Sequence, residues 1–367
     1  MFQNSSKITK KSPLFEEHKK HKAKFISIAE WTMPISFRGI VPEHITVKKY
    51  AGIVDLSNAG KFFIKGEKAE DFLNFLMPQS IDKMANNTIL EGQFVTQDGT
   101  ILDKVSVYKI SKKEFLILIS SFRITVLQQW LDKHNADFDI EIENITEDYS
   151  IIELLGKNAD EIIQKVFSNN FEMENNFFKK TKIANEEVFL GKYSHCKENG
   201  YQIVAKNNKI VKIWHFLLKM GKNFNLEPIG FGVCDILRIE HGVPIFPNEI
   251  NESITPIEAS VQNIDTDKRN YLGQEKIVSQ IKNGTKKHLI GLELPDMTII
   301  SLGTPIFFNK KPIGIVTSCN LSPVSRRAFG LGYVVIEIDK DIPVEISFNQ
   351  KSYNAKIVNL PFIKEEG

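Results

Sequence analysis

The carboxylate residue Asp103 follows the turn sequence DGT (98–100) and precedes the predicted strand Val105 to Val107. A carboxylate in such a place commonly accepts hydrogen bonds from backbone N–H groups of the turn. A carboxylate can also orient a substrate, move a proton or stabilise a developing positive charge. Lys104 follows at once, and it would favour the charged form of Asp103 if the two side chains paired. If Lys104 points away along the strand, it has no such effect.

Two further residues offer a charge and a flat ring. Arg238 lies in DILRIEHG (235–242), whose spacing predicts a short helix that ends at Gly242. Its guanidinium would form an ion pair within a partly buried helix or bind a carboxylate of a ligand. His195 lies in YSHCKENGYQI (193–203) and would have a structural role or stack on a flat ring.

The composition excludes several classes of protein. The 367 residues carry 47 basic and 45 acidic side chains, a net charge of +2, so the basic excess of a nucleic-acid-binding protein is absent. Cys196, Cys234 and Cys319 are far apart and odd in number, which favours a reducing compartment over a disulfide scaffold. No apolar run approaches the roughly 18 residues that span a bilayer. We therefore expect a cytoplasmic protein with interspersed surface charges that binds no nucleic acid, membrane or metal.

The elements that would position these residues repeat one order. Lys61 to Lys65 predicts a strand that ends at a glycine, and Ala69 to Leu76 then predicts a helix. Ser150 to Leu155, a second glycine and a helix from Ala159 follow the same order. The repeat favours a duplicated α+β unit, although it is short enough to arise by chance.

Other runs complete the predicted organisation. Val105 to Ile110 and Phe115 to Ser120 predict a hairpin, and Ile210 to Met220 predicts a helix. From His288 onward six β-rich runs indicate a small antiparallel barrel or sandwich: HLIGLEL, TPIFFN, KPIGIVTS, GLGYVVIEI, PVEISFN and YNAKIVNLPF. We place a boundary near residue 283 and expect regions at 1–145, 146–283 and 284–367.

Several short motifs follow one another along the chain: WTMP (31–34), AGIVDLS (51–57), DGTILD (98–103), DILRIEHG (235–242), TPIEA (255–259) and LGYV (331–334). In this order they resemble the glycine cleavage T-protein family of aminomethyltransferases. The resemblance implies an α+β fold, a three-domain cloverleaf of two ferredoxin-like α+β domains and a C-terminal antiparallel β-barrel. It also implies that the first two regions build a folate site in a central hole.

The resemblance assigns roles to individual residues. Asp103 would be the catalytic carboxylate that faces the reactive nitrogens of tetrahydrofolate, and Arg238 would contribute to the folate site. Aligning the chain on GY (200–201) places Gln202 where the family has a pterin-binding glutamate. The remaining folate contacts that the resemblance implies are His195, Tyr201, Met33 and Ser120.

Among the positions that depart from the family pattern, three bear on folate binding. Asn58 replaces a histidine, Ser120 replaces an asparagine, and Gln202 replaces the glutamate. A glutamine can accept only one set of the pterin's hydrogen bonds, and its NH2 group must find another partner. The change at Gln202 would leave folate binding intact, alter the preferred ligand or mark a lost site.

The resemblance implies tetrahydrofolate-dependent one-carbon transfer, with tetrahydrofolate as co-substrate. As an aminomethyltransferase, the chain would take an aminomethyl group from a lipoylated carrier protein, release ammonia and form 5,10-methylenetetrahydrofolate. Two alternatives remain open: a tetrahydrofolate-dependent demethylase of a small methylated compound, and a non-catalytic YgfZ-like folate-binding protein. The segment RNYLGQE (269–275) resembles the KGCYxGQE signature of the YgfZ-like proteins but lacks its cysteine.

Overall fold

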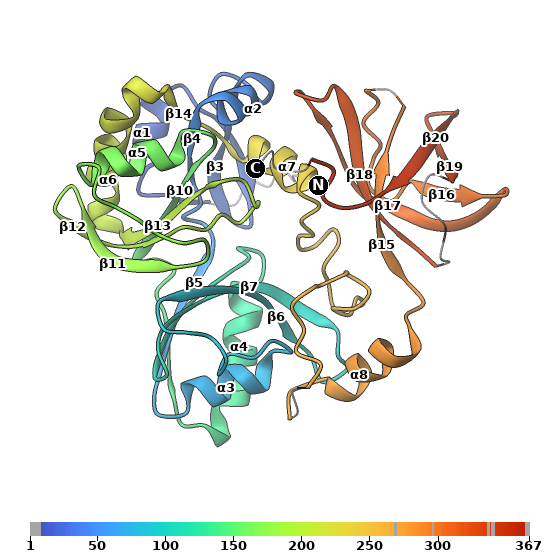
Figure 1. Cartoon of the computed structure of the whole chain (residues 1–367), viewed down its shortest axis with the longest axis horizontal. Coiled ribbons are helices and arrows are strands. Elements are labelled where there is room, and N and C mark those ends of the chain that lie inside the picture. The colour runs from blue at the N-terminus through green and yellow to red at the C-terminus, as the bar shows by residue number, and fades with distance from the viewer. Residues whose placement is uncertain (1–8, 268–269, 296, 336–337, 339–341, 364–367) are drawn as a thin grey trace. The chain divides into compact units, whose positions relative to one another are not determined.

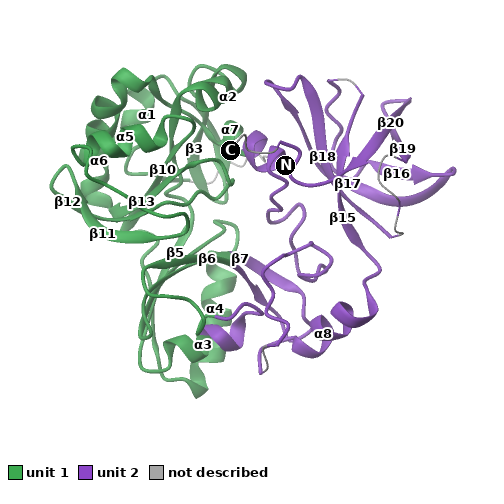
Figure 2. Cartoon of the chain, viewed as in Figure 1, with its two compact units in different colours: residues 1–72, 81–91, 105–234 green, residues 73–80, 92–104, 235–367 purple. Residues whose placement is uncertain are grey.

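The computed structural model describes residues 9–363 apart from 268–269, 296, 336–337 and 339–341. It divides into two compact units, the first made of residues 1–72, 81–91 and 105–234 and the second of residues 73–80, 92–104 and 235–367 (Figure 2). The chain passes between the units within α3 (Ala69–Leu76), again between residues 80 and 81, and then within β6 (Thr88–Val95), β7 (Ile101–Ser111) and α7 (Phe231–Glu240). The three predicted domain ranges stay predictions.

A six-stranded sheet is the centre of the first unit (Figure 1). Its strands are antiparallel except for the parallel pair β14–β4. In spatial order they are β11 (Phe178–Ile183), β12 (Glu186–Gly191), β13 (Gly200–Lys206), β10 (Tyr149–Leu155), β4 (Ala51–Asp55) and β14 (Leu226–Pro228). Every residue of β10 after Tyr149 is buried, as its apolar sequence and central place require.

Two helices, α5 (Ala159–Val166) and α6 (Asn207–Gly221), supply apolar side chains to one core with this sheet. Ile162 of α5 and Trp214 of α6 are fully buried there, together with Ile152 of β10 and Ile203 of β13. Full burial of such a side chain contributes about 1.5–3 kcal/mol. This core therefore holds β10 and β13 in a defined register, which matters for the polar groups these strands carry.

The remaining strands before residue 150 form two smaller sheets. A five-stranded sheet has the order β6, β7, β8 (Glu114–Ile119), β5 (Gly60–Lys65) and β9 (Glu141–Asn144), and a three-stranded sheet has the order β1 (Lys10–Lys11), β3 (Trp31–Ser36) and β2 (Lys24–Ile28). Further helical segments are α1 (Phe15–Lys20), α2 (Ile40–Lys49), α4 (Ile124–His134), η1 (Asn135–Asp137) and η2 (Lys222–Phe224). The predicted hairpin is confirmed as β7–β8.

The predicted strand–glycine–helix order is confirmed in both places. Strand β5 is followed by Gly66 (φ 141°) and α3, and β10 is followed by Gly156 (φ 114°) and α5. A Cβ atom at Gly156 would lie 2.3 Å from the backbone oxygen of Val47. Both the backbone angle and the close approach therefore require glycine at residue 156.

The helix that carries Arg238 begins earlier than predicted, at Phe231 rather than Asp235. Gly230 precedes this helix, and Gly232 lies in its first turn. Close packing explains the glycine at residue 230, because a Cβ atom there would lie 2.3 Å from the carbonyl carbon of Ile35.

The C-terminal part of the second unit is a closed six-stranded barrel, which confirms the predicted α+β class with an antiparallel β-barrel (Figure 1). Around the barrel the strands are β15 (His288–Glu293), β18 (Arg327–Val334), β17 (Lys311–Ser322), β16 (Pro305–Phe308), β19 (Pro343–Phe348) and β20 (Lys351–Val358). Val344 and Ile346 are buried while their neighbours are not, the alternation expected of a barrel wall. Residues 336–337 of the predicted run GLGYVVIEI lie outside the described residues.

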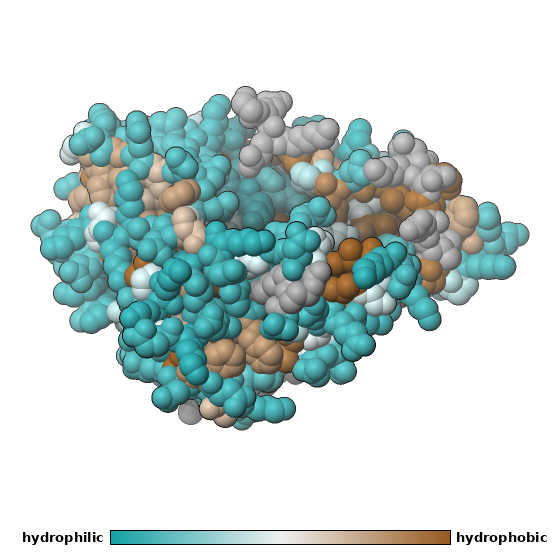
Figure 3. All heavy atoms as spheres, turned by 60° about the horizontal axis from the view of Figure 1, so that its bottom comes forward, coloured by the Kyte–Doolittle hydropathy of each residue, from teal (hydrophilic) through white to brown (hydrophobic). Residues whose placement is uncertain are grey.

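The surface agrees with the charge pattern of the sequence. On the face drawn in Figure 3 hydrophilic residues predominate, and apolar residues form separate patches among them. No helix of the described residues is long and apolar enough to cross a membrane.

Candidate active site

Gln202 and Glu153 form a buried polar pair across two strands of the first unit. They are directly opposite each other on β13 and β10, and they are 4% and 0% exposed. The Gln202 Nε2 group donates to Glu153 Oε1 at 2.6 Å, and Gln202 Oε1 accepts from the Tyr108 hydroxyl at 2.6 Å. Both ends of the amide are therefore held, and Glu153 is the partner that the NH2 group of a glutamine requires.

The Tyr108 hydroxyl stays a donor in this network. Burial raises the pKa of Tyr108 well above its ordinary value, and the charge of Glu153 adds to the effect. A neutral hydroxyl must donate to Gln202 Oε1, so the amide orientation is determined by its neighbours.

His195 joins the same buried carboxylate. Its backbone N–H donates to Glu153 Oε1 at 3.1 Å, and its ring Nδ1 lies 2.7 Å from Glu153 Oε2. The carboxylate oxygen requires the proton on Nδ1, which orients the ring. The side chain is 34% exposed, so part of the ring faces solvent, as stacking on a flat ligand would need.

Sequence reasoning missed Glu153. It lies in the run SIIELL, which was interpreted only as an apolar strand. The available signal was a lone charged residue at the middle of an apolar strand, because a buried carboxylate needs several donors. Glu153 receives three of them, two from His195 and one from Gln202.

Tyr201 lies apart from this network. Adjacent residues of a strand point to opposite faces, and the Tyr201 ring belongs to the apolar core beneath α5 and α6. Its hydroxyl donates to Asp160 Oδ1 at 2.6 Å. The structure thus brings Gln202 and His195 together and places Tyr201 on the other face of β13.

Met33 and Ser120 have different surroundings. Met33, on β3, is fully buried in a small apolar cluster with Ile28 and Trp31. Ser120 follows β8 and is half-buried, and its Oγ accepts from the N–H of Phe122 at 3.3 Å. Their assignment as folate contacts stays a prediction.

A second buried carboxylate that carried no predicted role, Glu43, joins separate parts of the first unit. Its Oε1 accepts from the backbone N–H groups of Phe37, Arg38 and Gly39 at 2.6, 2.7 and 3.0 Å. Its Oε2 accepts from the N–H of Gly230 at 2.9 Å. Glu43 is fully buried, so it fixes the loop before α2 against the segment that leads into α7.

Asp103 lies in the second unit, three residues beyond a tight turn. Thr96 and Thr100 close this turn, because the Thr96 N–H donates to the Thr100 carbonyl at 2.9 Å. Asp103 is fully buried, and the next residue, Lys104, is half-buried on the opposite face of β7. This placement suits a carboxylate shielded from bulk water, where charge stabilisation is strong.

Arg238 is also in the second unit and is held on three sides. Its Nε donates to Asp235 at 2.9 Å, one terminal nitrogen to Glu249 at 3.0 Å and the other to Ser318 Oγ at 2.7 Å. Burial opposes the charge, but Glu249 and Asp235 outweigh it and raise the pKa of Arg238 above its ordinary value. The guanidinium is 4% exposed and forms an internal ion pair, one of the two roles considered from the sequence, and its contribution to a folate site stays a prediction.

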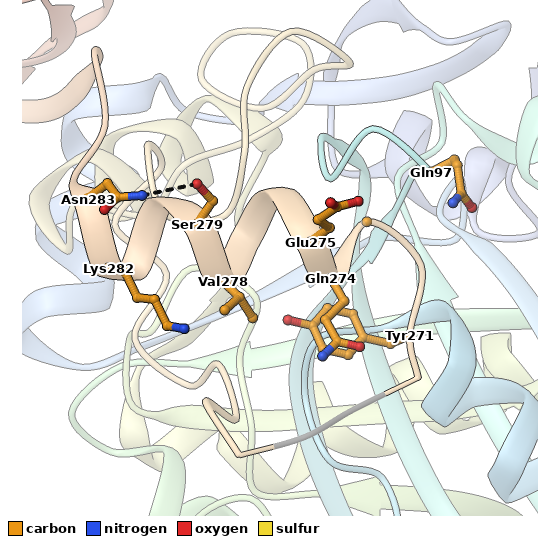
Figure 4. Close-up of a pocket in the computed structure, with 9 residues that line it drawn as sticks. Gln97, Tyr271, Gln274, Glu275, Val278, Ser279, Lys282 and Asn283 are labelled. Carbon is orange, nitrogen blue, oxygen red and sulfur yellow. Dashed lines mark hydrogen bonds between the residues drawn. The ribbon is translucent and has the colours of Figure 1, made fainter.

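A pocket of about 630 Å³ lies along α8 (Gln274–Asn283) in the second unit, at the segment RNYLGQE (Figure 4). Its lining residues are Gln97, Tyr271, Gly273, Gln274, Glu275, Val278, Ser279, Lys282 and Asn283. None of the predicted site residues lines it, and residue 269 of the segment lies outside the described residues.

Comparison with known proteins identifies the family. The family model of the GCVT N-terminal domain matches residues 14–267, and that of the glycine cleavage T-protein C-terminal barrel domain matches residues 287–364. The aminomethyltransferase of Thermoanaerobacter pseudethanolicus is 31% identical over 97% of this chain and 98% of its own length. That of Bacillus pumilus is 31% identical over 97% of this chain and 99% of its own length.

A solved structure has the same fold. The glycine cleavage system aminomethyltransferase T from Bartonella henselae matches with a TM-score of 0.89 at 22% identity, over 96% of this chain and 98% of that one. The order of the sequence motifs, the C-terminal barrel and these full-length matches agree. The chain therefore belongs to the glycine cleavage T-protein family of aminomethyltransferases, a family of enzymes.

Proposed function

We propose that this chain transfers an aminomethyl carbon to tetrahydrofolate. It would take the aminomethyl group from a lipoylated carrier protein, release ammonia and form 5,10-methylenetetrahydrofolate. The observation that carries the proposal is the match over nearly the whole length of relatives named aminomethyltransferase. The buried carboxylate at residue 103, where the family motif has its aspartate, supports it.

Asp103 is the proposed catalytic carboxylate. A buried carboxylate stabilises positive charge on the carbon in transfer and can hold or move a proton at its Oδ atoms. Burial strengthens this interaction, because water does not screen it. Transfer to tetrahydrofolate should therefore depend on the charge of residue 103 and not only on its shape.

Gln202 and His195 are the proposed pterin contacts in the first unit. Gln202 Oε1 already accepts one hydrogen bond and Nε2 already donates one, so one acceptor site and one N–H remain on the amide. These groups fit a 2-amino-4-oxo pterin, which has both donors and acceptors along its edge. The partly exposed ring of His195 would stack on the pterin.

The test is a reconstituted reaction with an aminomethyl-lipoyl carrier protein and tetrahydrofolate, in which ammonia and 5,10-methylenetetrahydrofolate are measured. Asp103→Asn should lower kcat by at least about 100-fold. Asp98→Asn is the matched control, because Asp98 lies in the same turn region but is exposed, and it should stay within about twofold of the parent. An unchanged kcat for Asp103→Asn would refute the catalytic role.

Anaerobic calorimetric titration with tetrahydrofolate tests binding separately. Saturable binding without turnover on the carrier, followed by turnover on a free methylated compound, would replace this proposal with the demethylase reaction. The demethylase reaction is tested as well because of Gln202. Its carbonyl and NH2 groups stand where the resemblance to the aminomethyltransferase motif implies a carboxylate.

A further inference from the structure

Three side chains of different chemistry meet beside the Gln202 pair in the first unit. They are Glu153 of β10 and the neighbours His195 and Cys196, which precede β13. A carboxylate oxygen, a ring nitrogen and the thiol sulfur all lie within 4.8 Å of one another. We propose that Glu153, His195 and Cys196 bind a divalent transition-metal ion, Zn²⁺ by their chemistry.

The types of ligand atom select the metal. Zn²⁺ takes sulfur, nitrogen and oxygen ligands together, whereas Mg²⁺ and Ca²⁺ take oxygen ligands only. Zn–S bonds of about 2.3 Å and Zn–N or Zn–O bonds of about 2.0 Å in a tetrahedron place the ligand atoms about 3.3–3.6 Å apart. Nδ1 of His195 and Oε2 of Glu153 are 2.7 Å apart, so they must separate by less than about 1 Å to admit the ion.

Outer hydrogen bonds already orient the ligands. Gln202 Nε2 and the backbone N–H of His195 both donate to Glu153 Oε1 and leave Oε2 directed at the imidazole. Ser194 Oγ lies 3.4 Å from Cys196 Sγ. Such contacts around the ligands raise metal affinity because the side chains lose little freedom on binding.

The site combines a buried interior with an opening to solvent. Glu153 and Cys196 are fully buried, while His195 is 34% exposed and gives the ion a route from solution. Binding releases one proton, from the Cys196 thiol, and the ring proton of His195 moves from Nδ1 to Nε2, because both ligand atoms must offer a lone pair to the metal. Three protein ligands leave the fourth tetrahedral position for water or a substrate atom, as in catalytic zinc sites.

The sequence hid this site, because Glu153 and His195 are 42 residues apart and only the β10–β13 pairing brings them together. The sequence alone therefore predicts no metal site. The inference does not rest on the proposed function, since metal binding is measured without folate or a carrier protein.

The experiment is titration of the full-length chain, freed of metal by a chelator, first with Co²⁺ and then with Zn²⁺. We expect one equivalent of Co²⁺ to bind with the visible absorption of a tetrahedral ion and a sulfur-to-cobalt band in the near ultraviolet. Stoichiometric Zn²⁺ should then remove both signals, whereas excess Mg²⁺ should leave them unchanged.

Two variants and a matched control complete the test. Cys196→Ser should abolish the sulfur-to-cobalt band. Loss of a hydrogen bond to a metal ligand weakens binding by up to about 100-fold, so loss of the thiolate ligand itself should weaken Zn²⁺ binding by at least that factor. Cys319→Ser should bind as the parent does, because Cys319 is a free cysteine in the other unit. His195→Ala, at a partly exposed position that tolerates truncation, should lose at least about tenfold and serves if Cys196→Ser does not fold. Absence of saturable Zn²⁺ binding by the parent, or parent-like binding by the folded Cys196 or His195 variant, would overturn the proposal.

Discussion

Lys61 carries the most quantitative prediction about this chain. It is fully buried in β5, and its Nζ donates to the backbone carbonyls of Ser57 and Ala59 at 2.9 and 2.7 Å. Burial lowers the pKa of Lys61 to about 7, although the charge of Asp55 acts in the opposite direction. Replacing Lys61 by Met removes the titration of this residue from both the folded and the unfolded chain.

The sign and size of the effect follow from proton linkage. In the unfolded chain a lysine has a pKa of about 10.4. Between pH 7 and that value the unfolded chain binds a proton that the folded chain does not, so the free energy of unfolding rises with pH by up to about 1.4 kcal/mol per unit. Below about pH 7 both states are protonated and the full cost of the buried charge remains. From pH 6.5 to 9.5 the Lys61 contribution becomes more favourable by about 3 kcal/mol.

The assay is urea unfolding of the parent and of Lys61→Met at several pH values in this range. The quantity of interest is the difference in free energy of unfolding between the two proteins. Taking the difference cancels the titration of other groups, such as Cys196 and Cys319, whose pKa values are raised by burial to about 12 and about 11. The difference should change by about 3 kcal/mol in favour of the parent as pH rises.

Lys65→Met is the control from the same strand. The Lys65 side chain is 35% exposed and pairs with Glu143, and this hydrogen bond raises the pKa of Lys65. Its difference profile should therefore be flat below about pH 9.5. A flat profile for Lys61→Met as well would mean that Lys61 keeps its charge throughout this range, and the reasoning from burial would be wrong.

Three further changes test other buried polar groups. Gln202→Glu introduces the residue that the family resemblance implies, but it places a second carboxylate opposite Glu153. The free energy of unfolding at pH 7, measured by urea unfolding, should therefore fall by about 2–3 kcal/mol. A second substitution in the same chain, Glu153→Gln, should recover part of this loss. Glu43→Gln replaces one acceptor oxygen by an NH2 group opposite a backbone N–H, and it should lower the free energy of unfolding by about 3 kcal/mol, which the urea midpoint would report. Burial alone would raise the pKa of Asp55, but hydrogen bonds, first from His18, hold it below its ordinary value. The stability that Asp55 contributes is therefore present above about pH 4 and lost as pH falls through the folded pKa, so unfolding of the parent and Asp55→Asn should converge in strong acid.

Each of these changes has its own contradicting result. If the second substitution, Glu153→Gln, recovers none of the free energy of unfolding, charge repulsion is not the cause of the loss in Gln202→Glu. Glu67→Gln, at an 80% exposed side chain, is the control for Glu43→Gln, and equal effects of the two would contradict the role given to the four backbone N–H donors. A constant difference between the parent and Asp55→Asn from pH 6 to strong acid would exclude the proposed titration.

Most secondary structure and the family could be predicted from the sequence, because both depend on short-range patterns. The helix Ala69–Leu76 agrees with its prediction at both ends, since its apolar spacing and the preceding glycine define it locally. The six β-rich runs of the C-terminal part were enough to predict a barrel or a sandwich, and closure of the sheet decided for the barrel. The predicted start of α7 is wrong by four residues, because the close packing that accommodates Gly230 and Gly232 at its N-terminal end comes from residues far away in the sequence.

The polar interior depended on tertiary structure. The sequence by itself determined that residue 202 is a glutamine, at the place where the resemblance to the family motif implies a glutamate, and that its NH2 group needs a partner. Only the register of β10 against β13 decided that this partner is Glu153, and the same register brings His195 to the carboxylate. Arg238 likewise has Ser318 as a partner through a barrel strand far along the chain. A hydrogen bond between such residues requires a donor–acceptor distance that is correct to within a few tenths of an ångström. Tertiary structure, including the register of paired strands, sets these distances, and the spacing of residues along the sequence does not reveal them.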